Sequence, residues 1–486
     1  MRLRTLGVLV AACLTGIAPL SVAAEGEEGA HSPNMKYVKN IEYAARNGDT
    51  PNFGTDIEFF RIDGRRYAFA GSYRNGLHIV DVSNPRASHV VAVYDCGVTQ
   101  GDVQVFRRGD LGGRVFVTYT SDTFGDGTST CYREAAARGF EVLKPNGVGK
   151  NGTFIADVTR PENPTTVSFV DVPQGSHNQT VHPSGKFLYN SNSDLITSFE
   201  PAIEIYDIRD IDKPKPVGEL ALPTRPGLGT ESHDITFNSS GTRAYSAALS
   251  QGVIINTTKP ARPKIITSFL DPAINVWHQS DPFTLTDPRT KKKRDFLIAE
   301  DEVAGAVGTG QCPNGGVHIY DITGARERNP EKVGYWNIDE IRPTSNVTDS
   351  CTAHVFDIHQ RAQIMTIAYY NGGVRVVDIS GLVGISLGDK SLPGEQGMKQ
   401  IGFYRTPNAD SWSAKTPYID RKSGDFYLYG NDINRGLDIY FFDGSARRSR
   451  SSGVWMTPDE AEAALATRPK VELSPATAFF CLRPPD

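Results

Sequence analysis

The chain of 486 residues is 39% hydrophobic and 22% charged, which fits a folded protein rather than a disordered one. Its formal net charge is −5, so no strong basic field exists to attract nucleic acid. The 47 glycines and 30 prolines favour many turns and therefore many short strands. After the N-terminal segment, no apolar run is long enough for a transmembrane helix. We therefore expect neither nucleic-acid binding nor a membrane-spanning segment.

The first feature in chain order is an N-terminal targeting segment. Arg2 and Arg4 precede an apolar run that ends in Val22-Ala23-Ala24 before acidic residues. This pattern is typical of a secretory signal peptide cleaved after Ala24. The alternative is lipidation of Cys13, because the tetrapeptide VAAC resembles a lipobox. In both cases we expect a protein that is secreted or held at the cell surface.

One short segment recurs along the chain. Its first copy, GLHIVDVSNP (Gly76–Pro85), is a β-branched run that ends in a polar turn, as a strand and its hairpin require. The six later copies are Gly152–Pro161, Ala202–Asp210, Gly252–Pro260, Gly316–Gly324, Gly373–Gly381 and Gly436–Gly444. Other strand-like segments flank each copy, so each repeat predicts four antiparallel strands. Seven such repeats predict an all-β fold, a seven-bladed β-propeller.

The two ends of the chain are expected to complete this fold. The seventh repeat lacks an obvious fourth strand, whereas MKYVKNIEYAA (Met35–Ala45) is unused ahead of the first repeat. Pairing the two closes the ring and removes an open sheet edge. The segment Thr457–Arg468 starts with a T-x-x-E capping box, which predicts a short C-terminal helix. The predicted organisation is a signal peptide (1–24), a linker (25–34), the propeller (35–445) and a tail (446–486).

The recurring strand resembles the repeat of the LVIVD-repeat family. The segments LHIVD, IEIYD, VHIYD and VRVVD carry this likeness, which extends over nearly all of the mature chain. The resemblance implies an exported propeller protein. It implies no chemistry, because the motif is a strand with its turn and propellers host both enzymes and passive binding platforms.

Four of the ten histidines occupy one equivalent position, at the start of the first strand of four consecutive repeats. They are His177, His233, His278 and His354, and Asp56 and Asp102 hold the same position in the first two repeats. Because the first strand of a blade lines the channel, we expect these side chains to converge at the channel mouth. Imidazole and carboxylate ligands suit copper, zinc or iron. The alternative is a wet channel in which polar side chains hold water.

The cysteines predict disulfides on one face of the ring. Cys96 lies in the link from blade one to blade two, and Cys131 lies in the long insertion of blade two. Cys312 lies in the long insertion of blade five, and Cys351 lies in the link from blade five to blade six. Both pairs would pin loops of the channel-mouth face. Cys481 is left as a free thiol or an intermolecular partner. The same loops contribute carboxylates that we expect to form an acidic rim: Asp194, Glu300, Asp301, Glu302 and Asp432.

Three functions remain open, and the sequence does not decide whether the protein is an enzyme. The first is a metal site at the channel mouth of the copper-oxidoreductase type, acting on a small molecule. The second is a non-catalytic propeller whose disulfide-pinned face recognises an extracellular protein or glycan. The third is a lactonase-like hydrolase in which a metal activates water. No nucleophile elbow, phosphate loop, haem-attachment motif or zinc-protease helix is present.

Overall fold

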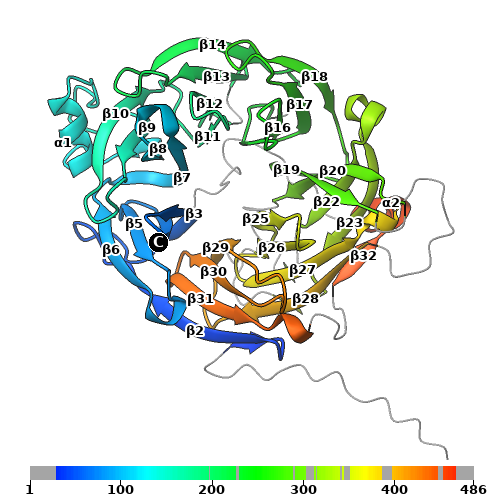
Figure 1. Ribbon diagram of the computed structural model, residues 1–486. Helices are drawn as coiled ribbons and strands as arrows, with labels where there is room; N and C mark the ends of the chain where they lie inside the picture. Colours follow the sequence, from blue (N-terminus) through cyan, green and yellow to red (C-terminus); the bar gives the residue numbers. More distant parts are fainter. Residues whose placement is uncertain are drawn as a thin grey trace, which may run out of the picture.

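The computed structural model is a ring of seven antiparallel sheets around a central channel (Figure 1). This confirms the predicted seven-bladed propeller with four strands in each blade. The predicted signal peptide, Cys13 and Cys481 lie outside the described residues. The residues that the structure describes are 29–195, 198–225, 229–287, 290–302, 311–312, 315–339, 342–343, 351–385, 397–446 and 453–466.

Each blade uses consecutive strands, and the first of them is innermost. Blade one consists of β3 (Gly54–Ile62), β4 (Arg65–Ser72), β5 (Leu77–Asp81) and β6 (His89–Tyr94). Blade two consists of β7 (Val98–Arg108), β8 (Arg114–Gly125), β9 (Gly152–Asp157) and β10 (Thr165–Asp171). Blade three consists of β11 (Asn178–Val181), β12 (Phe187–Ser191), β13 (Ala202–Asp207) and β14 (Lys215–Ala221).

The remaining blades continue this order around the ring. Blade four consists of β15 (Asp234–Phe237), β16 (Arg243–Ala248), β17 (Gln251–Asn256) and β18 (Lys264–Phe269). Blade five consists of β19 (Trp277–Thr286), β20 (Lys293–Asp301), β22 (Val317–Asp321) and β23 (Glu331–Asn337). Blade six consists of β25 (His354–His359), β26 (Ile364–Ala368), β27 (Val374–Gly381) and β28 (Gly397–Arg405). Blade seven consists of β29 (Ser411–Lys415), β30 (Phe426–Asp432), β31 (Gly436–Phe442) and β2 (Met35–Ile41).

The N-terminal strand closes the ring as predicted. Strand β2 pairs antiparallel with β31, from Met35 opposite Phe442 to Ile41 opposite Leu437. This pairing joins both ends of the propeller in one sheet and covers the outer edge of β31. Two short strands extend other blades, since β1 (Ala30–His31) pairs with β28 and β32 (Val454–Met456) pairs with β23.

The predicted C-terminal helix is α2 (Pro458–Leu465), which packs on blade five. The Thr457 hydroxyl accepts from the Glu460 backbone N–H and the Glu460 carboxylate accepts from the Thr457 backbone N–H, which is the predicted capping box. The other α-helix, α1 (Thr130–Ala137), lies in the insertion of blade two. No helix in the described part of the chain is long and apolar enough to cross a membrane.

Apolar side chains of neighbouring blades pack face to face and form the core between them. Leu77 and Ile79 of blade one, for example, share a buried cluster with Val103 and Val117 of blade two. Such packing explains the β-branched repeat strand, because both faces of a central propeller strand are buried between sheets. The inner strands are thereby held rigidly around the channel.

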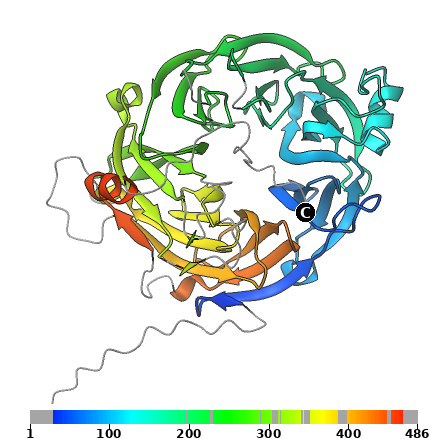
Figure 2. The ribbon, with the colours of Figure 1, turned by 180° about the vertical axis from the view of Figure 1, so that it is seen from behind.

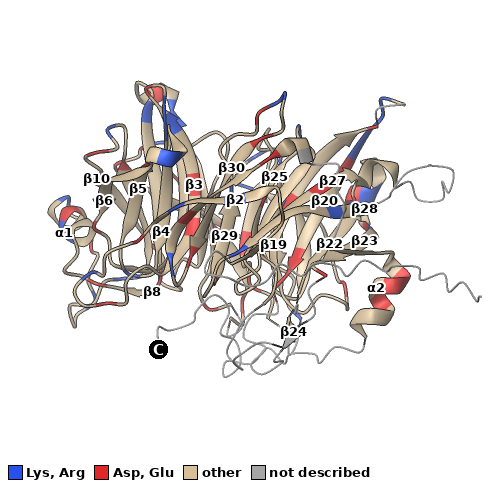
Figure 3. Cartoon of the chain, turned by 90° about the horizontal axis from the view of Figure 1, so that it is seen from below, with Lys and Arg blue, Asp and Glu red and all other residues tan. Residues whose placement is uncertain are grey.

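The two faces of the ring differ in what they carry, as the side view shows (Figure 3). We call the face with the links between blades and the long insertions the loop face. Both predicted disulfides, Cys96–Cys131 and Cys312–Cys351, are present there, with Cα atoms 5.1 and 5.0 Å apart. We call the opposite face, where the first and second strands of each blade are joined, the hairpin face. Figure 2 shows the ring from behind.

Candidate metal centre

The four predicted histidines lie side by side across blades three to six. The ring centroids of His177 and His233 are 4.3 Å apart, those of His233 and His278 are 4.1 Å apart, and those of His278 and His354 are 4.4 Å apart. All four side chains are at most 3% exposed. They form an arc because each lies at the start of the innermost strand of its blade or directly before it.

Each imidazole is held by a hydrogen bond or ion pair at Nδ1. Nδ1 of His233 lies 3.1 Å from the carbonyl oxygen of His278, and Nδ1 of His354 lies 2.5 Å from that of Trp412. Because a carbonyl oxygen can only accept, His233 and His354 carry their proton on Nδ1. Their Nε2 atoms therefore present a lone pair to the channel.

Carboxylates take the corresponding place beside the other two imidazoles. Nδ1 of His177 lies 3.3 Å from Asp122 Oδ2, and Nδ1 of His278 lies 3.1 Å from Glu300 Oε2. Both carboxyl groups are fully buried. Partners of this kind fix the orientation of an imidazole and raise its basicity as a ligand.

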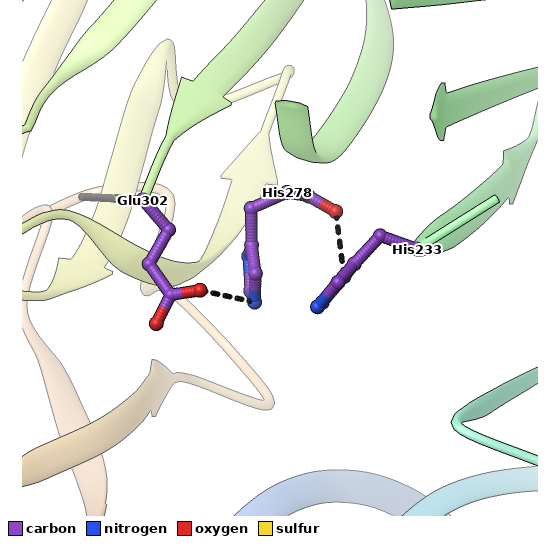
Figure 4. Close-up of side chains that lie close together, drawn as sticks. All are labelled: His233, His278 and Glu302. Carbon is purple, nitrogen blue, oxygen red and sulfur yellow. Dashed lines mark hydrogen bonds and ion pairs between the residues drawn. The ribbon is translucent and has the colours of Figure 1, made fainter. Parts of the chain in front are cut away.

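The Nε2 atoms point toward one another and toward a buried carboxylate. Nε2 of His177 lies 2.9 Å from Nε2 of His233. The Glu302 carboxylate lies 3.5 Å from Nε2 of His278 and 3.7 Å from Nε2 of His354. Ligand atoms of His233, His278 and Glu302 all lie within 4.8 Å of one another (Figure 4). This spacing is suitable for one metal ion.

Burial keeps His233, His278 and His354 neutral. It lowers the pKa of His278 to about 4, and, with the neighbouring imidazoles, it lowers the pKa values of His233 and His354 well below 6.5. Neutral imidazole is the form that binds a metal. The same burial raises the pKa of Glu300 well above its usual range, which a nearby cation would reverse.

Asp56 and Asp102 line the same cavity as the histidines but make different contacts. Asp56 pairs with Lys415 at 2.9 Å, and Asp102 accepts a hydrogen bond from the Gln179 backbone N–H at 3.1 Å. In blade two it is Gln100 that reaches His177, with 3.3 Å between its Nε2 and that of the imidazole. The register of β7 on β8 shifts around Gln100. Counting residues back from the second strand therefore aligned Asp102 with the histidines, although Gln100 is the residue that lies beside them.

The sequence reasoning missed Glu302, Asp122 and Glu300 as parts of this cluster. The prediction of an acidic rim was wrong for four of its five carboxylates, because Glu300, Asp301, Glu302 and Asp432 are at most 1% exposed, whereas Asp194 is half-buried. They end or follow the second strands of their blades, where the connections of the loop face cover them. The run Glu300-Asp301-Glu302 directly after an apolar strand was the available signal.

A cavity of about 510 Å³ leads away from the histidines along the inner strands. It begins at the four imidazoles and Trp412 and ends at Pro183, Phe237 and Pro417 near the hairpin face. Exposure rises in the same direction, since the histidines are buried whereas Phe237 is half-buried and Pro183 is exposed. Among the described residues, the histidines thus lie at the inner end of a cavity that widens toward the hairpin face. The expected mouth on the loop face is not where this cavity leads.

Comparison with known protein families agrees with the repeat. The family model described as "LVIVD repeat" matches residues 65–95, which confirms the predicted resemblance. The β-propeller domain of Myceliophteria thermophila Cps50 (Swd1) is similar in structure, with 11% sequence identity, a TM-score of 0.48, and coverage of 84% of this chain and 99% of that chain. No curated protein matches the chain.

Proposed function

For this seven-bladed propeller built of LVIVD repeats, we propose that the histidine cluster is a transition-metal centre of the copper-oxidoreductase type. His177, His233, His278 and His354 would bind the metal through Nε2, with Glu302 as a further ligand. A small molecule would reach the centre through the cavity.

One observation carries this proposal, the way in which the imidazoles are arranged. Two of them are held by carbonyl acceptors at Nδ1 and turn their Nε2 lone pairs inward. Two Nε2 atoms at 2.9 Å need either a cation or one proton between them, and that proton requires the Nε2–H tautomer of His177. This tautomer would leave the lone pair of His177 Nδ1 facing the Asp122 carboxylate at 3.3 Å, so a metal ion is the better partner. Polar side chains that only hold water in a channel would not need to turn their Nε2 atoms toward one another.

The type of metal follows from the donor set and its surroundings. Imidazole nitrogens suit copper, zinc or iron. Tyr370 and Trp412 pack on His354 with ring centroids 4.6 and 4.8 Å away. Such oxidisable side chains beside the centre favour redox chemistry over hydrolysis.

Among the described residues, one side of the centre has no imidazole. Blades seven, one and two contribute Trp412, Thr55 and Gln100 to the cavity wall there. A bound metal would supply redox or Lewis-acid chemistry at this open side. The protein would exclude bulk water through the burial of the four imidazoles and would orient each of them through Nδ1.

We also propose that the protein works outside the cytoplasm. The two disulfides suit an oxidising compartment, and the N-terminal segment reads as a signal peptide.

Elemental analysis of the untagged protein tests the proposal. We expect about one equivalent of copper in the parent and less than a tenth of that in a His233→Ala/His278→Ala double variant. His89→Ala is the matched control, because His89 is exposed on the outer strand of blade one. It should retain the metal.

The outcomes separate the candidate functions. Copper with an absorption band in the visible range supports the oxidoreductase. Zinc without such a band would replace the oxidoreductase with a hydrolytic centre. A metal-free parent that gains no thermal stability from copper, zinc or iron would overturn the proposal and leave a non-catalytic binding propeller.

A further inference from the structure

The cavity between the histidines and the hairpin face is strongly acidic. Lys415 is the only lysine or arginine among its described lining residues. The acidic residues that line it are Asp56, Glu58, Asp102, Asp234, Asp281 and Asp357. Acidic segments are visible on the inner strands β3 and β19 in Figure 3. Lys415 pairs with Asp56 and Glu58, each at 2.9 Å, so part of this charge is neutralised within the protein.

Three of the carboxyl groups have no such partner. We call Asp102, Asp234 and Asp281 the acidic arc; among the described residues none of them forms an ion pair. Asp281 accepts from the Thr236 hydroxyl at 2.6 Å, and Asp234 accepts from the Ile235 backbone N–H at 2.6 Å. Asp357, by contrast, lies 3.2 Å from His359. Among the described residues, the acidic arc is therefore the part of the wall whose carboxyl groups have no ion-pair partner.

Electrostatics supports this view of the acidic arc. Burial, reinforced by the nearby Asp357, raises the pKa of Asp281 to about 6. Burial and the nearby Asp56 raise the pKa of Asp102 well above its usual range. A cation bound at the arc would relieve this repulsion.

An independent observation at the same cavity points to a ligand with N–H donors. Gln100 is 6% exposed and lines the cavity, two residues before Asp102. Its Oε1 has no hydrogen-bond partner among the described residues. A buried amide oxygen without a donor costs about 1–3 kcal/mol, so such a group is expected to accept a hydrogen bond when the site is filled.

The acidic arc extends from the histidines toward the hairpin face. Asp234 directly follows His233, whereas Asp281 follows His278 by three residues on β19, which corresponds to at most about 10 Å along an extended strand. A positive charge beside Asp281 is therefore separated from a metal at the imidazoles. Between the histidines and the hairpin face the wall also contains apolar rings, including Phe59, Phe237 and Phe356.

We propose that the molecule admitted to the centre is a small organic cation with a protonated amino group. It enters from the hairpin face, its ammonium group binds the acidic arc, and its other end points to the histidines, where Gln100 accepts a hydrogen bond from it. The inference deepens the proposed function and rests on it, because it names the class of molecule that the metal centre acts on. The cation binding itself requires only the described cavity.

Calorimetric titration of the full chain with n-butylammonium tests the proposal. We expect saturable binding at pH 7 that n-butanol and butyrate fail to reproduce, because neither carries a positive charge. Equal binding of n-butanol would overturn the proposal. So would competition by Mg²⁺ or Na⁺ at equal concentration, since the acidic arc would then be a site for inorganic cations.

Variants separate binding from folding. Asp102→Asn and Asp281→Asn should each weaken n-butylammonium binding at least tenfold. Asp102→Asn should leave the melting temperature unchanged or raise it, because it removes a repelled buried carboxyl group. Asp63→Asn is the matched control, because Asp63 is exposed in the β3–β4 turn on the hairpin face. Unchanged binding in both arc variants would contradict the proposal.

The same titration distinguishes the two proposals from each other. Repeating it after chelation, beside the elemental analysis, gives a separate result for each. Metal without n-butylammonium binding refutes the substrate class and leaves the metal centre standing. Binding of n-butylammonium by a protein that takes up no metal refutes the metal centre and leaves the cation site.

Discussion

The Nε2 atoms of His177 and His233 lie 2.9 Å apart, although 56 residues separate the two histidines in the sequence. They come from the innermost strands of neighbouring blades, and each ring is held from behind at Nδ1. The propeller thus brings to one point side chains that no local motif would unite.

Asp122 orients His177 from behind, so its charge should matter for the metal rather than for the fold. We expect Asp122→Asn to weaken metal affinity by about 10–100-fold, because the amide no longer holds the imidazole as an ionic partner. Metal titration followed by absorption or calorimetry measures this. Asp63→Asn serves as control, since Asp63 is exposed, and equal affinities of the two variants would argue against an orienting role.

Asn431 links blade seven to blade one through hydrogen bonds and should be important for stability. Its Nδ2 donates to the backbone oxygens of Thr55, Asp56 and Gly71, and its Oδ1 accepts from the Tyr43 hydroxyl. Asn431→Ala leaves these buried groups without partners, which should cost about 2–4 kcal/mol of unfolding free energy. Denaturant unfolding measures the loss. A change in unfolding free energy below about 0.5 kcal/mol would show that these hydrogen bonds are not needed for stability.

The Cys96–Cys131 disulfide should stabilise the insertion of blade two. It links residues 35 apart, and closing a loop of this size in the unfolded chain corresponds to about 4 kcal/mol. The Cys96→Ala/Cys131→Ala variant should therefore unfold at lower denaturant concentration. Proteolysis of the insertion near α1 is a second readout. Equal denaturation midpoints with and without reductant would contradict the prediction.

His78 should make the protein less stable in mild acid. It stacks on Tyr43 with ring centroids 3.9 Å apart, and burial lowers its pKa from 6.5 to about 4. The folded state therefore binds fewer protons than the unfolded state between these pH values. Its contribution is fully present above pH 6.5 and falls by up to about 3 kcal/mol as the pH decreases toward 4.

His78→Phe isolates this contribution. The variant keeps an aromatic ring against Tyr43 and removes the titrating group. Unfolding free energies measured from pH 7 to pH 4 should fall less steeply in the variant than in the parent. Parallel pH profiles would mean that other groups account for the acid sensitivity.

Much of the fold was readable from the sequence because a propeller repeats one local pattern. The strand-and-turn segment marks each blade, and the unused strand at Met35–Ile41 found its partner in β31. Both disulfides followed from the same scheme, since loops of one face are close whatever their conformation. Phasing also separated His177 from His182. The latter lies in the turn after β11, where its Nε2 is 2.8 Å from the carbonyl oxygen of Gly241.

The site could be predicted only in part, because the sequence pattern does not show how deep in the channel a side chain lies or where it points. A shift in the register of β7 put Gln100, rather than Asp102, beside His177. Covering loops turned the expected acidic rim into buried partners, of which Glu302 and Glu300 contact His278.

The sequence by itself therefore determined the seven blades, their closure and the set of histidines on neighbouring inner strands. The tertiary structure alone decided how the imidazoles are oriented, which carboxylates stand behind them, and that the cavity from them leads to the hairpin face. The physical reason is that repeat spacing encodes which strands are neighbours. Hydrogen bonds and packing between segments far apart in the chain decide where the side chains point.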